Sequence, residues 1–328
     1  MQLQNYAAGQ WIAGSGKQSE LIDAITGDLI GTTSSGGLDF GHMLHYARTV
    51  GGPPLRKMTF PERGRMLKAL AQYLFERKDK YYEISYRTGA TKADSWVDIE
   101  GGIGNLFANA SLRRVLGNMP FYVDGDTVKT SKGGTFIGHH IMVPKEGVAV
   151  HINAFNFPIW GMLEKVAVNW MAGVPAVVKP ATVTSYLTEA MVKDIVASGI
   201  LPEGALQLIV GSAEGLLETV TSQDVVTFTG SASTGRMLKK HPRIVDESVP
   251  FNMEADSLNA IVLGPDATPG TEEFDLFSKE VGKEMTLKCG QRCTGARRIL
   301  VPANVLEDVQ IALGKRLGKQ PVGRYELA

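Results

Sequence analysis

Cysteine, net charge and long apolar runs are scarce in this sequence, and each absence excludes a class of protein. Two cysteines four residues apart, Cys289 and Cys293, cannot cross-link a chain of 328 residues, which excludes a disulfide scaffold and indicates a reducing compartment. Lys and Arg number 34, as do Asp and Glu, so no global field attracts nucleic acid or an anionic membrane. No apolar run reaches the roughly 20 residues of a membrane span, and residues 1–6 do not resemble a signal peptide. We therefore predict a cytoplasmic protein without nucleic acid or membrane partners.

Apolar residues make up 44% of the chain, and their spacing from residue 147 onward predicts an α/β fold. Short apolar runs alternate with segments of helical periodicity, which is typical of a doubly wound parallel sheet. Such a sheet binds ligands beyond the carboxyl ends of its strands. We expect strands at 147–152, 174–178, 206–210, 225–229, 250–253 and 258–263, and helices at 160–170, 187–197, 213–220 and 234–240.

The region before this sheet predicts short strands, a long helix and a hairpin. Residues 5–37 are rich in glycine and hold short apolar pieces, which indicates strands and turns. Thr59 and Glu62 have the spacing of a capping box, and the apolar periodicity after them predicts one helix ending near 88–89. Residues 120–145 alternate β-type residues with glycines, which predicts an extended hairpin.

A second long helix, from 95 to about 115, contains three glycines. Glycine lowers helix stability relative to alanine. We therefore expect Gly101, Gly102 and Gly104 to allow close packing against another element, which offsets that cost.

The pattern divides the chain into two domains. Residues 1–264 hold the sheet and form the first domain. Residues 265–328 repeat an αβα pattern with expected elements at 273–288, 299–301 and 304–317. One strand and two helices cannot cover both faces of a parallel sheet, so this second α/β domain is expected to be incomplete.

Three turns at predicted strand ends carry residues that suit ligand binding. The first runs from His151 to Pro158 and places Asn153 and Asn156 before a helix. Amide side chains at this point suit an anion or oxyanion site. The alternative is that both asparagines only cap the helix.

The second turn places Lys179 directly after a buried strand, so its ammonium group reaches the binding edge of the sheet, although a lysine there can equally be only solvated. The third turn, 228–235, has glycines at both ends and suits a phosphate loop. Arg236 stands where a P-loop requires lysine, and the chain holds no G-x-G-x-x-G, so neither nucleotide fingerprint is present.

Two residues are candidates for reactive groups. Glu254 ends a predicted strand within an apolar stretch, and burial raises the pKa of a carboxylate toward the range of a general base. Cys293 lies in a glycine-bounded turn beside Arg292, and a cation next to a thiol lowers its pKa, which favours a nucleophile. The alternatives are a solvated cap and a small buried residue. Cys289 and Cys293 have no nearby histidine, so we predict no metal site.

In this order, the motifs resemble the NAD(P)-dependent aldehyde dehydrogenase superfamily. The likeness extends over about residues 3–323 and is closest to the aldehyde dehydrogenase half of the bifunctional phenylacetate-degradation protein. It implies a Rossmann-like fold with the start of a catalytic domain, and an oligomerisation role for the hairpin at 120–145. The matching segments are 156–158 (Asn-Phe-Pro), 179–181 (Lys-Pro-Ala), 228–231 (Phe-Thr-Gly-Ser), Glu254, 290–293 (Gly-Gln-x-Cys) and the longer runs 93–104, 151–158 and 253–258.

The resemblance assigns roles to the candidate residues. Cys293 would attack the aldehyde, Asn156 and the Cys293 N–H would form the oxyanion hole, and Glu254 would activate the water that hydrolyses the thioester. The family's NAD-preferring members often have Glu where this chain has Thr182, so we expect NADP, with NAD as the alternative. The residues implied in cofactor binding are Ile152, Asn153, Phe155, Lys179, Thr182, Gly215, Phe228, Gly230, Ser231 and Ala255.

The implied substrate is a small-molecule semialdehyde, CoA-linked, from phenylacetate-type aromatic degradation, and the benzoyl-CoA-pathway enzymes are close neighbours of this type. A CoA-acylating dehydrogenase is a second enzymatic interpretation, which Glu254 disfavours because such enzymes often lack this residue.

The chain departs from the family pattern toward its end. The Glu-x-Phe-Gly-Pro motif, the strand that completes the oligomer and the hydratase half are missing, and 323–328 match no family pattern. We therefore expect a truncated chain with weak cofactor binding and slow turnover, a homo-oligomer only at full length, and a nucleotide-binding module without turnover as the alternative.

Overall fold

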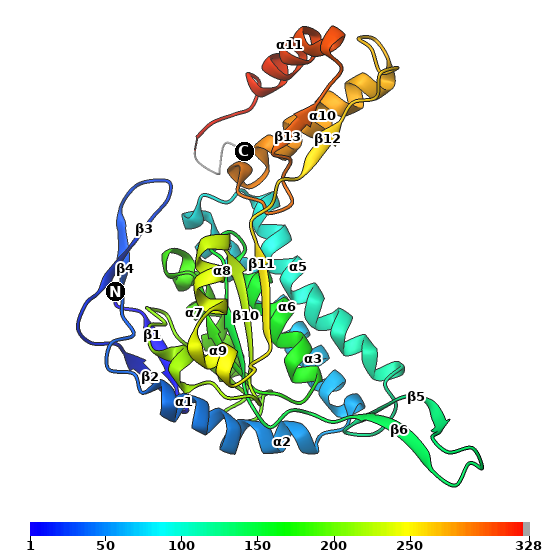
Figure 1. Ribbon diagram of the computed structural model, residues 1–328. Coiled ribbons are helices and arrows are strands. Elements are labelled where there is room, and N and C mark those ends of the chain that lie inside the picture. The colour runs from blue at the N-terminus through cyan, green and yellow to red at the C-terminus, as the bar shows by residue number, and fades with distance from the viewer. Residues whose placement is uncertain (324–328) are drawn as a thin grey trace.

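The computed structural model describes residues 1–323 and has a seven-stranded sheet at its centre (Figure 1). The strand order is β11-β10-β7-β8-β9-β1-β2. Five neighbouring strands, β11 to β9, are parallel, and β1 pairs with β9 in the antiparallel sense. The predicted doubly wound parallel sheet is confirmed. The strands are β1 (Gln4–Ala7), β2 (Gln10–Ala13), β7 (Ala149–Ile152), β8 (Ala176–Lys179), β9 (Leu206–Leu208), β10 (Val225–Gly230) and β11 (Phe251–Ala255).

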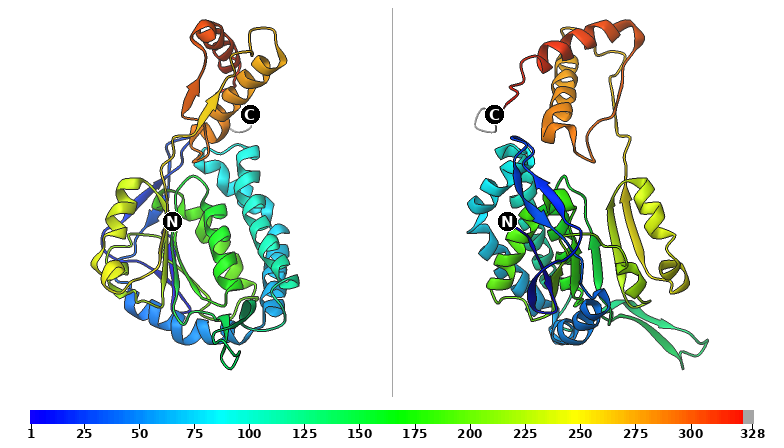
Figure 2. Two further views of the ribbon diagram at one scale, coloured as in Figure 1. Left: turned by 45° about the vertical axis from the view of Figure 1, so that its right-hand side comes forward. Right: turned by 90° about the vertical axis from the view of Figure 1, so that its left-hand side faces the viewer.

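Helices cover both faces of this sheet because its central strands are apolar on both sides. Val177 and Val178 are consecutive residues of β8, and they pack into two different buried clusters on opposite faces. α3, α5 (Lys92–Ser111), α6 and α7 cover one face, whereas α1, α8 and α9 lie on the other (Figure 2). The bounds are α1 (Phe40–Tyr46), α2 (Gly52–Lys57), α3 (Phe60–Phe75), α6 (Pro158–Met171), α7 (Ser185–Ala197), α8 (Ala232–Lys239) and α9 (Pro242–Asp246).

The capping box at the start of α3 is confirmed, but the single helix expected after it is wrong. Thr59 accepts the Glu62 N–H, and Glu62 in turn accepts the Thr59 N–H. The helix ends at Phe75, and α4 (Lys78–Ser85) follows after Arg77 leaves the helical region at φ −111°. Apolar periodicity continues across the break because both helices bury one face in the same core. The sequence pattern therefore does not indicate where α3 ends.

The glycines of α5 (Lys92–Ser111) lie against α6, as expected for two of the three. A Cβ on Gly101 would lie 2.3 Å from the Trp160 ring, and one on Gly102 would lie 3.0 Å from the Trp160 Cα. A Cβ on Gly104 would meet nothing within 4 Å, so the expected close packing is wrong there. The helix begins three residues before the predicted 95, at a second capping box formed by Thr91 and Asp94.

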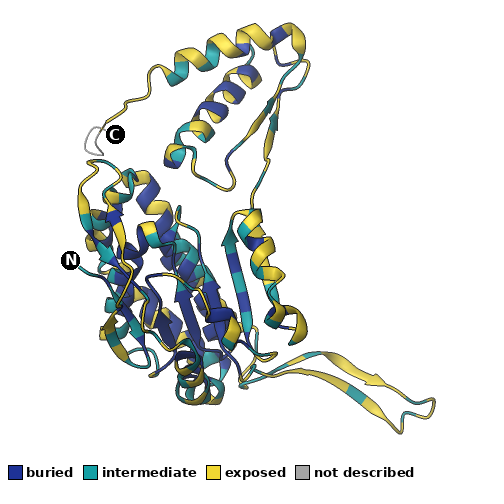
Figure 3. Ribbon diagram, turned by 60° about the vertical axis from the view of Figure 1, so that its left-hand side comes forward, coloured by how far each residue is buried: buried dark blue, intermediate teal, exposed yellow. Residues whose placement is uncertain are grey.

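The predicted hairpin at 120–145 is confirmed as β5 (Tyr122–Lys129) and β6 (Ile137–Met142). It extends away from the sheet, and most of its side chains are exposed (Figure 3). A second hairpin, β3 (Ser19–Ile22) and β4 (Leu29–Thr33), lies near the N-terminus. The helix expected at 213–220 is only a short 3-10 turn, Leu216–Thr219, since Gly215 has a left-handed φ of 84° that ordinary helices do not adopt.

Residues beyond β11 form a separate unit with its own core. The parallel pair β12 (Ala260–Val262) and β13 (Arg298–Leu300) packs against α10 (Glu272–Thr286) and α11 (Leu306–Leu317). Phe274, Phe277 and Val281 of α10 are buried in this core. The domain boundary was expected at 264, after β12, but this strand pairs with β13 and does not join the seven-stranded sheet. Residues 324–328 of the second predicted domain lie outside the described residues. In residues 1–323, no helix combines the length and apolar character of a membrane span.

Candidate active site

The carboxyl ends of four parallel strands bring most of the predicted site residues to one edge of the sheet. Ile152 of β7 pairs with Lys179 of β8 on one side and with Phe228 of β10 on the other. At the next strand, Gly230 pairs with Ala255 of β11. The turns after these strands therefore meet at the edge where such sheets bind ligands.

Lys179, the last residue of β8, places a positively charged side chain at this edge of the sheet. Burial lowers the pKa of its ammonium group, which makes a nearby anion favourable. Thr182 begins the short helical turn Thr182–Thr184 and carries no charge beside this lysine. The Thr184 hydroxyl donates to the Phe155 carbonyl at 3.2 Å, which ties this turn to the one after β7.

Small residues at the start of α8 allow other atoms to approach the backbone closely. Ser231 is the N-cap of this helix and accepts the Thr234 N–H at 3.3 Å. A Cβ on Gly230 would lie 2.6 Å from the Phe228 ring, so a side chain there would require the ring to shift. Gly215 begins the neighbouring turn, and a Cβ there would meet nothing within 4 Å.

Two further predicted residues differ in their surroundings. Phe155 is 45% exposed at this edge. Asn153 is buried, and among residues 1–323 both polar atoms of its side chain have no hydrogen-bond partner. Its side chain therefore does not cap α6, whose N-cap residue Phe157 also makes no side-chain bond.

The loop that carries Cys293 has an unusual backbone. Lys288 and Cys289 have left-handed φ values of 52° and 51°, and Gly290 follows with 71°. Ser257 and Asn259, which come shortly after β11, both donate to the Cys293 carbonyl, Asn259 at 2.7 Å. Sequence reasoning missed these two contacts, because serine and asparagine in a turn give no signal for a partner 34 to 36 residues away.

Cys293 and Glu254 face one another in the structure. Burial raises the pKa of the Cys293 thiol, and the adjacent Glu254 carboxylate raises it further through its charge and a hydrogen bond. The lowered thiol pKa that Arg292 led us to expect is therefore wrong. Arg292 is engaged elsewhere, since its guanidinium pairs with Glu284 at 2.9 Å. Glu254 is exposed rather than half-buried, because β11 is the edge strand of the sheet.

Asn156 contacts the same loop. Its Nδ2 group donates to the Gln291 carbonyl at 2.7 Å, two residues before Cys293. The three residues predicted to be catalytic thus come from three segments that the fold brings together: the start of α6, the end of β11 and the cysteine loop.

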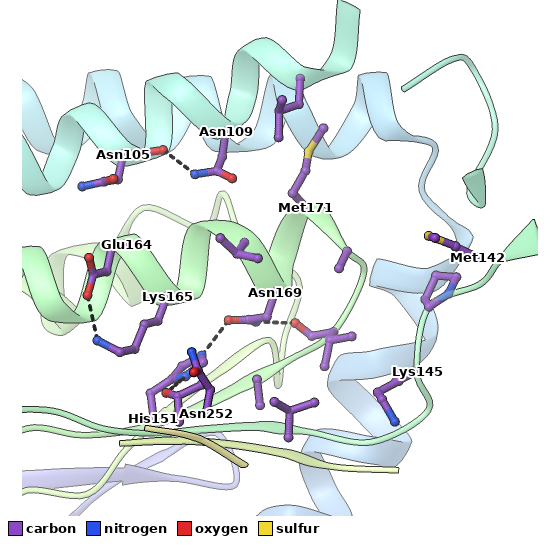
Figure 4. Close-up of a pocket in the computed structure, with 18 of the residues that line it drawn as sticks. Asn105, Asn109, Met142, Lys145, His151, Glu164, Lys165, Asn169, Met171 and Asn252 are labelled. Atoms are coloured by element: carbon purple, nitrogen blue, oxygen red, sulfur yellow. Dashed lines mark hydrogen bonds and ion pairs between the residues drawn. The ribbon is translucent and has the colours of Figure 1, made fainter. Parts of the chain in front are cut away.

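A cavity of about 920 Å³ lies between α5, α6 and the sheet (Figure 4), and Glu254 is among the residues that line it. Its lining is mainly apolar, and Glu164 and Lys165 of α6 form an ion pair of 2.8 Å within it. On the sheet side, His151 bonds Thr227 and Asn169, each at 2.8 Å, and burial lowers the pKa of its ring to about 4. The imidazole is thus held neutral near pH 7.

Comparison with known proteins identifies the family. Residues 11–327 match the model of the aldehyde dehydrogenase family. A 3,4-dehydroadipyl-CoA semialdehyde dehydrogenase from Aromatoleum evansii is 46% identical over 98% of this chain, and a 2,5-dioxopentanoate dehydrogenase from Saccharolobus solfataricus is 27% identical over 80%. The chain belongs to the aldehyde dehydrogenase family. It spans 63% of the length of the first relative and 53% of the second.

Solved structures show the same fold. Betaine aldehyde dehydrogenase from Staphylococcus aureus, in complex with NAD+, matches with a TM-score of 0.83 and 20% identity, over 98% of this chain and 62% of that one. A 3,6-anhydro-L-galactose dehydrogenase in complex with NADP matches with a TM-score of 0.86 and 21% identity, over 99% and 66%. Both nucleotides therefore occur in proteins of this fold.

Proposed function

We propose that this chain belongs to an enzyme that oxidises a CoA-linked semialdehyde to the carboxylic acid with NADP+, through a thioester on Cys293. The single observation that carries the proposal is the contact between Cys293 and Glu254, with Asn156 holding the same loop. A thiol beside a carboxylate, with an amide donor nearby, is suited to acyl transfer.

The chemistry follows from these side chains. The raised pKa of Cys293 means that its thiol must lose a proton to react, and the adjacent Glu254 carboxylate is placed to accept it. The thiolate then adds to the aldehyde carbon and gives a hemithioacetal. The Asn156 amide has two N–H groups, of which one donates to Gln291, so the second can stabilise the oxyanion.

The second half of the reaction hydrolyses the thioester. Glu254 first releases the thiol proton to solvent and then removes a proton from a water molecule; the hydroxide adds to the thioester carbon, and the Cys293 thiolate leaves as the acid forms. The nucleotide held beside Lys179 and the turn 228–231 would supply the hydride acceptor for oxidation of the hemithioacetal to the thioester.

The strand edge fits a dinucleotide with an additional phosphate. Lys179 supplies a cation, the N-terminus of α8 supplies N–H groups behind Ser231, and Thr182 places no negative charge beside them. We therefore propose Lys179 as the contact to the adenine ribose and the turn 228–231 as the contact to the phosphates. Ile152, Asn153, Phe155, Gly215 and Ala255 complete the proposed cofactor site.

The proposed substrate class rests on the relative from Aromatoleum evansii, whose name specifies a CoA-linked semialdehyde. We propose a homo-oligomer for the whole enzyme, with the β5–β6 hairpin as the contact between copies.

The test is the acyl-enzyme itself. The purified chain is mixed with NADP+ and either 3,4-dehydroadipyl-CoA semialdehyde or succinic semialdehyde, and intact mass and absorbance at 340 nm are followed. We expect an adduct on Cys293 that is absent in Cys293→Ser. In Glu254→Gln the adduct should form more slowly, because the base for the thiol is lost, and should then persist, because hydrolysis is blocked. A nucleotide-binding module without turnover would bind NADP+ and form no adduct, and that outcome contradicts the proposal.

Cofactor preference is tested separately. Thr182→Glu should weaken NADP+ binding at least tenfold relative to NAD+, since a carboxylate repels the extra phosphate. Titration calorimetry with both nucleotides measures this ratio, and Thr182→Gln is the matched uncharged control. Equal affinity of the unaltered chain for NAD+ and NADP+ would contradict the NADP assignment.

A further inference from the structure

Two carboxylates of α5 hold both the cysteine loop and the start of α6. Asp94 and Asp98 are one helical turn apart, so they share a face of the helix. Asp94 Oδ1 accepts the backbone N–H of Lys288 at 2.9 Å. Asp98 Oδ1 accepts the N–H groups of Ile159 at 3.1 Å and Trp160 at 2.8 Å. One face of α5 therefore contacts the segment before Cys293 and the segment after Asn156.

Asp98 supplies the N-terminal cap that α6 lacks within its own segment. The N-cap residue Phe157 makes no side-chain bond, and Asp98 takes its place from the neighbouring helix. Asp98 is fully buried, and its Oδ2 has no hydrogen-bond partner among residues 1–323. A carboxylate in this position requires a cation nearby to stay charged.

Lys288 is that cation. Its side chain is only 4% exposed, and its Nζ lies 5.6 Å from the centre of the Phe157 ring, beside Asn156. Burial raises the pKa of Asp98 to about 6, and the Lys288 charge opposes this rise. Burial lowers the pKa of Lys288, whereas Asp98 and then Asp94 raise it. Each group thus favours the charged form of the other.

We propose that Asp94, Asp98 and Lys288, which we call the acid–lysine clasp, are positioning residues that set the placement of Cys293 relative to Asn156 and Glu254. The clasp joins the cysteine loop to the start of α6, the same two segments that the bond between Asn156 and Gln291 joins. It also holds Lys288 in its left-handed conformation, which lysine adopts only when its surroundings impose it. The importance of this placement for catalysis rests on the proposed function.

Loosening the clasp has a measurable consequence at the thiol. Cys293 owes part of its raised pKa to the contact with Glu254. A loop that moves away from Glu254 leaves the thiol with a lower pKa, so it becomes more reactive at neutral pH. Lys288 is not among the groups that shift the pKa of the Cys293 thiol, and direct loss of a cation would raise that pKa. A lowered pKa in a Lys288 variant must therefore act through the loop.

The experiment measures the rate of alkylation of Cys293 by iodoacetamide against pH, in a Cys289→Ser background that leaves one thiol. Glu254→Gln is the reference and should lower the pH midpoint. Lys288→Met should lower the midpoint by at least about 0.5 pH unit. Lys288→Arg keeps the positive charge and should retain most of the original pH profile. Lys283→Met, which removes an exposed lysine of α10, should leave the profile unchanged.

A second variant separates the clasp from folding. Asp98→Asn keeps an oxygen that accepts the two α6 N–H groups but removes the charge, so it should shift the midpoint in the same direction as Lys288→Met. Far-UV circular dichroism verifies that each variant is folded. The clasp is overturned if Lys288→Met and Asp98→Asn are folded and have the original midpoint, or if Glu254→Gln itself causes no shift. Failure of the acyl-enzyme test alone would remove the catalytic role and leave the clasp intact.

Discussion

Single buried side chains determine how this chain responds to pH and to substitution. His151 is buried beneath α6, with both ring nitrogens engaged by Thr227 and Asn169. Arg63 is also fully buried, and its guanidinium donates to the carbonyls of Leu55, Met171 and Pro120 at 3.0 to 3.1 Å. Neither residue belongs to the proposed catalytic group, so their substitution reports on the fold.

His151 should make the protein less stable in acid. Its pKa of about 4 lies below the ordinary 6.5, so the folded state keeps the ring neutral while the unfolded state takes up a proton. This contribution is complete above pH 6.5 and is lost as the pH falls toward 4, about 2 kcal/mol between pH 7.5 and pH 5. Urea unfolding of the unaltered chain and of His151→Gln at both pH values measures it.

His151→Gln should lose less stability on acidification than the unaltered chain. Asp98 acts in the opposite direction, because its pKa is raised to about 6 and its folded state binds a proton more readily than the unfolded state. Both proteins hold Asp98, so the free energy of unfolding of His151→Gln must be compared with that of the unaltered chain at each pH. Equal pH dependence in both proteins would contradict the assignment to His151.

Arg63 should be required for stability. Arg63→Met leaves carbonyls of α2, of the end of α6 and of Pro120 without this donor, and we expect a loss of roughly 3 kcal/mol or more in the free energy of unfolding. Arg63→Lys keeps the charge but cannot reach carbonyls in several directions, so an intermediate loss is expected. Urea unfolding followed by tryptophan fluorescence measures both, and a loss below about 1 kcal/mol for Met would contradict this role.

At the scale of elements, the packing of α5 against α6 depends on glycines, which have no side chain, at the point where the two helices cross. Trp160 covers Gly101, and its indole N–H donates to Glu164 at 2.9 Å, which holds the ring in place. The hydrogen bonds of Asp98 join the same two helices. Substitutions at the three glycines should therefore have opposite effects according to position.

Gly101→Ala should destabilise the protein, whereas Gly104→Ala should stabilise it. The new Cβ at position 101 would lie 2.3 Å from the Trp160 ring, so one helix must shift. At position 104 the new Cβ meets nothing within 4 Å, and alanine gains about 1 kcal/mol of helix propensity. Thermal unfolding of the two variants, side by side, decides the matter. A rise in Tm for Gly101→Ala would contradict the close packing.

Much of the fold at this scale could be predicted from local patterns. Capping boxes, buried β-type runs and glycine-bounded turns involve residues within a few positions of each other, so Thr59, the strand at 147–152 and the hairpin at 120–145 were recognisable. The break between α3 and α4 was not, because the two helices share one apolar face. The start of α5 was expected three residues too late, because the capping box formed by Thr91 and Asp94 lies before the predicted start at 95.

At the scale of the whole molecule, the unit beyond β11 has its own core and meets the sheet unit through the cysteine loop. The contacts of Asp94 with Lys288 and of Asn156 with Gln291 join the two. The core around α10 shares no residue with the two cores of the sheet unit. The two units should therefore differ in local stability.

Phe274→Ala should destabilise the unit beyond β11 without affecting the sheet unit. Phe274 is 5% exposed, and removal of a buried phenylalanine costs about 3–5 kcal/mol. Hydrogen exchange should become faster in α10 and α11 while β8 and α6 keep their protection. Leu276→Ala, on the exposed face of the same helix, is the matched control. Equal acceleration in both units would mean that they unfold as one.

The sequence by itself determined the class of fold, the strand ends that carry Lys179, Phe228 and Glu254, and the candidate roles of Cys293 and Asn156. It did so because periodicity, caps and short motifs are local features, and parallel strands bring their carboxyl ends to one edge. The tertiary structure alone decided that Glu254 faces Cys293 and raises the pKa of its thiol, and that Asp94 holds Lys288. These contacts join segments 39 and 194 residues apart, and only packing of the complete chain selects such pairs.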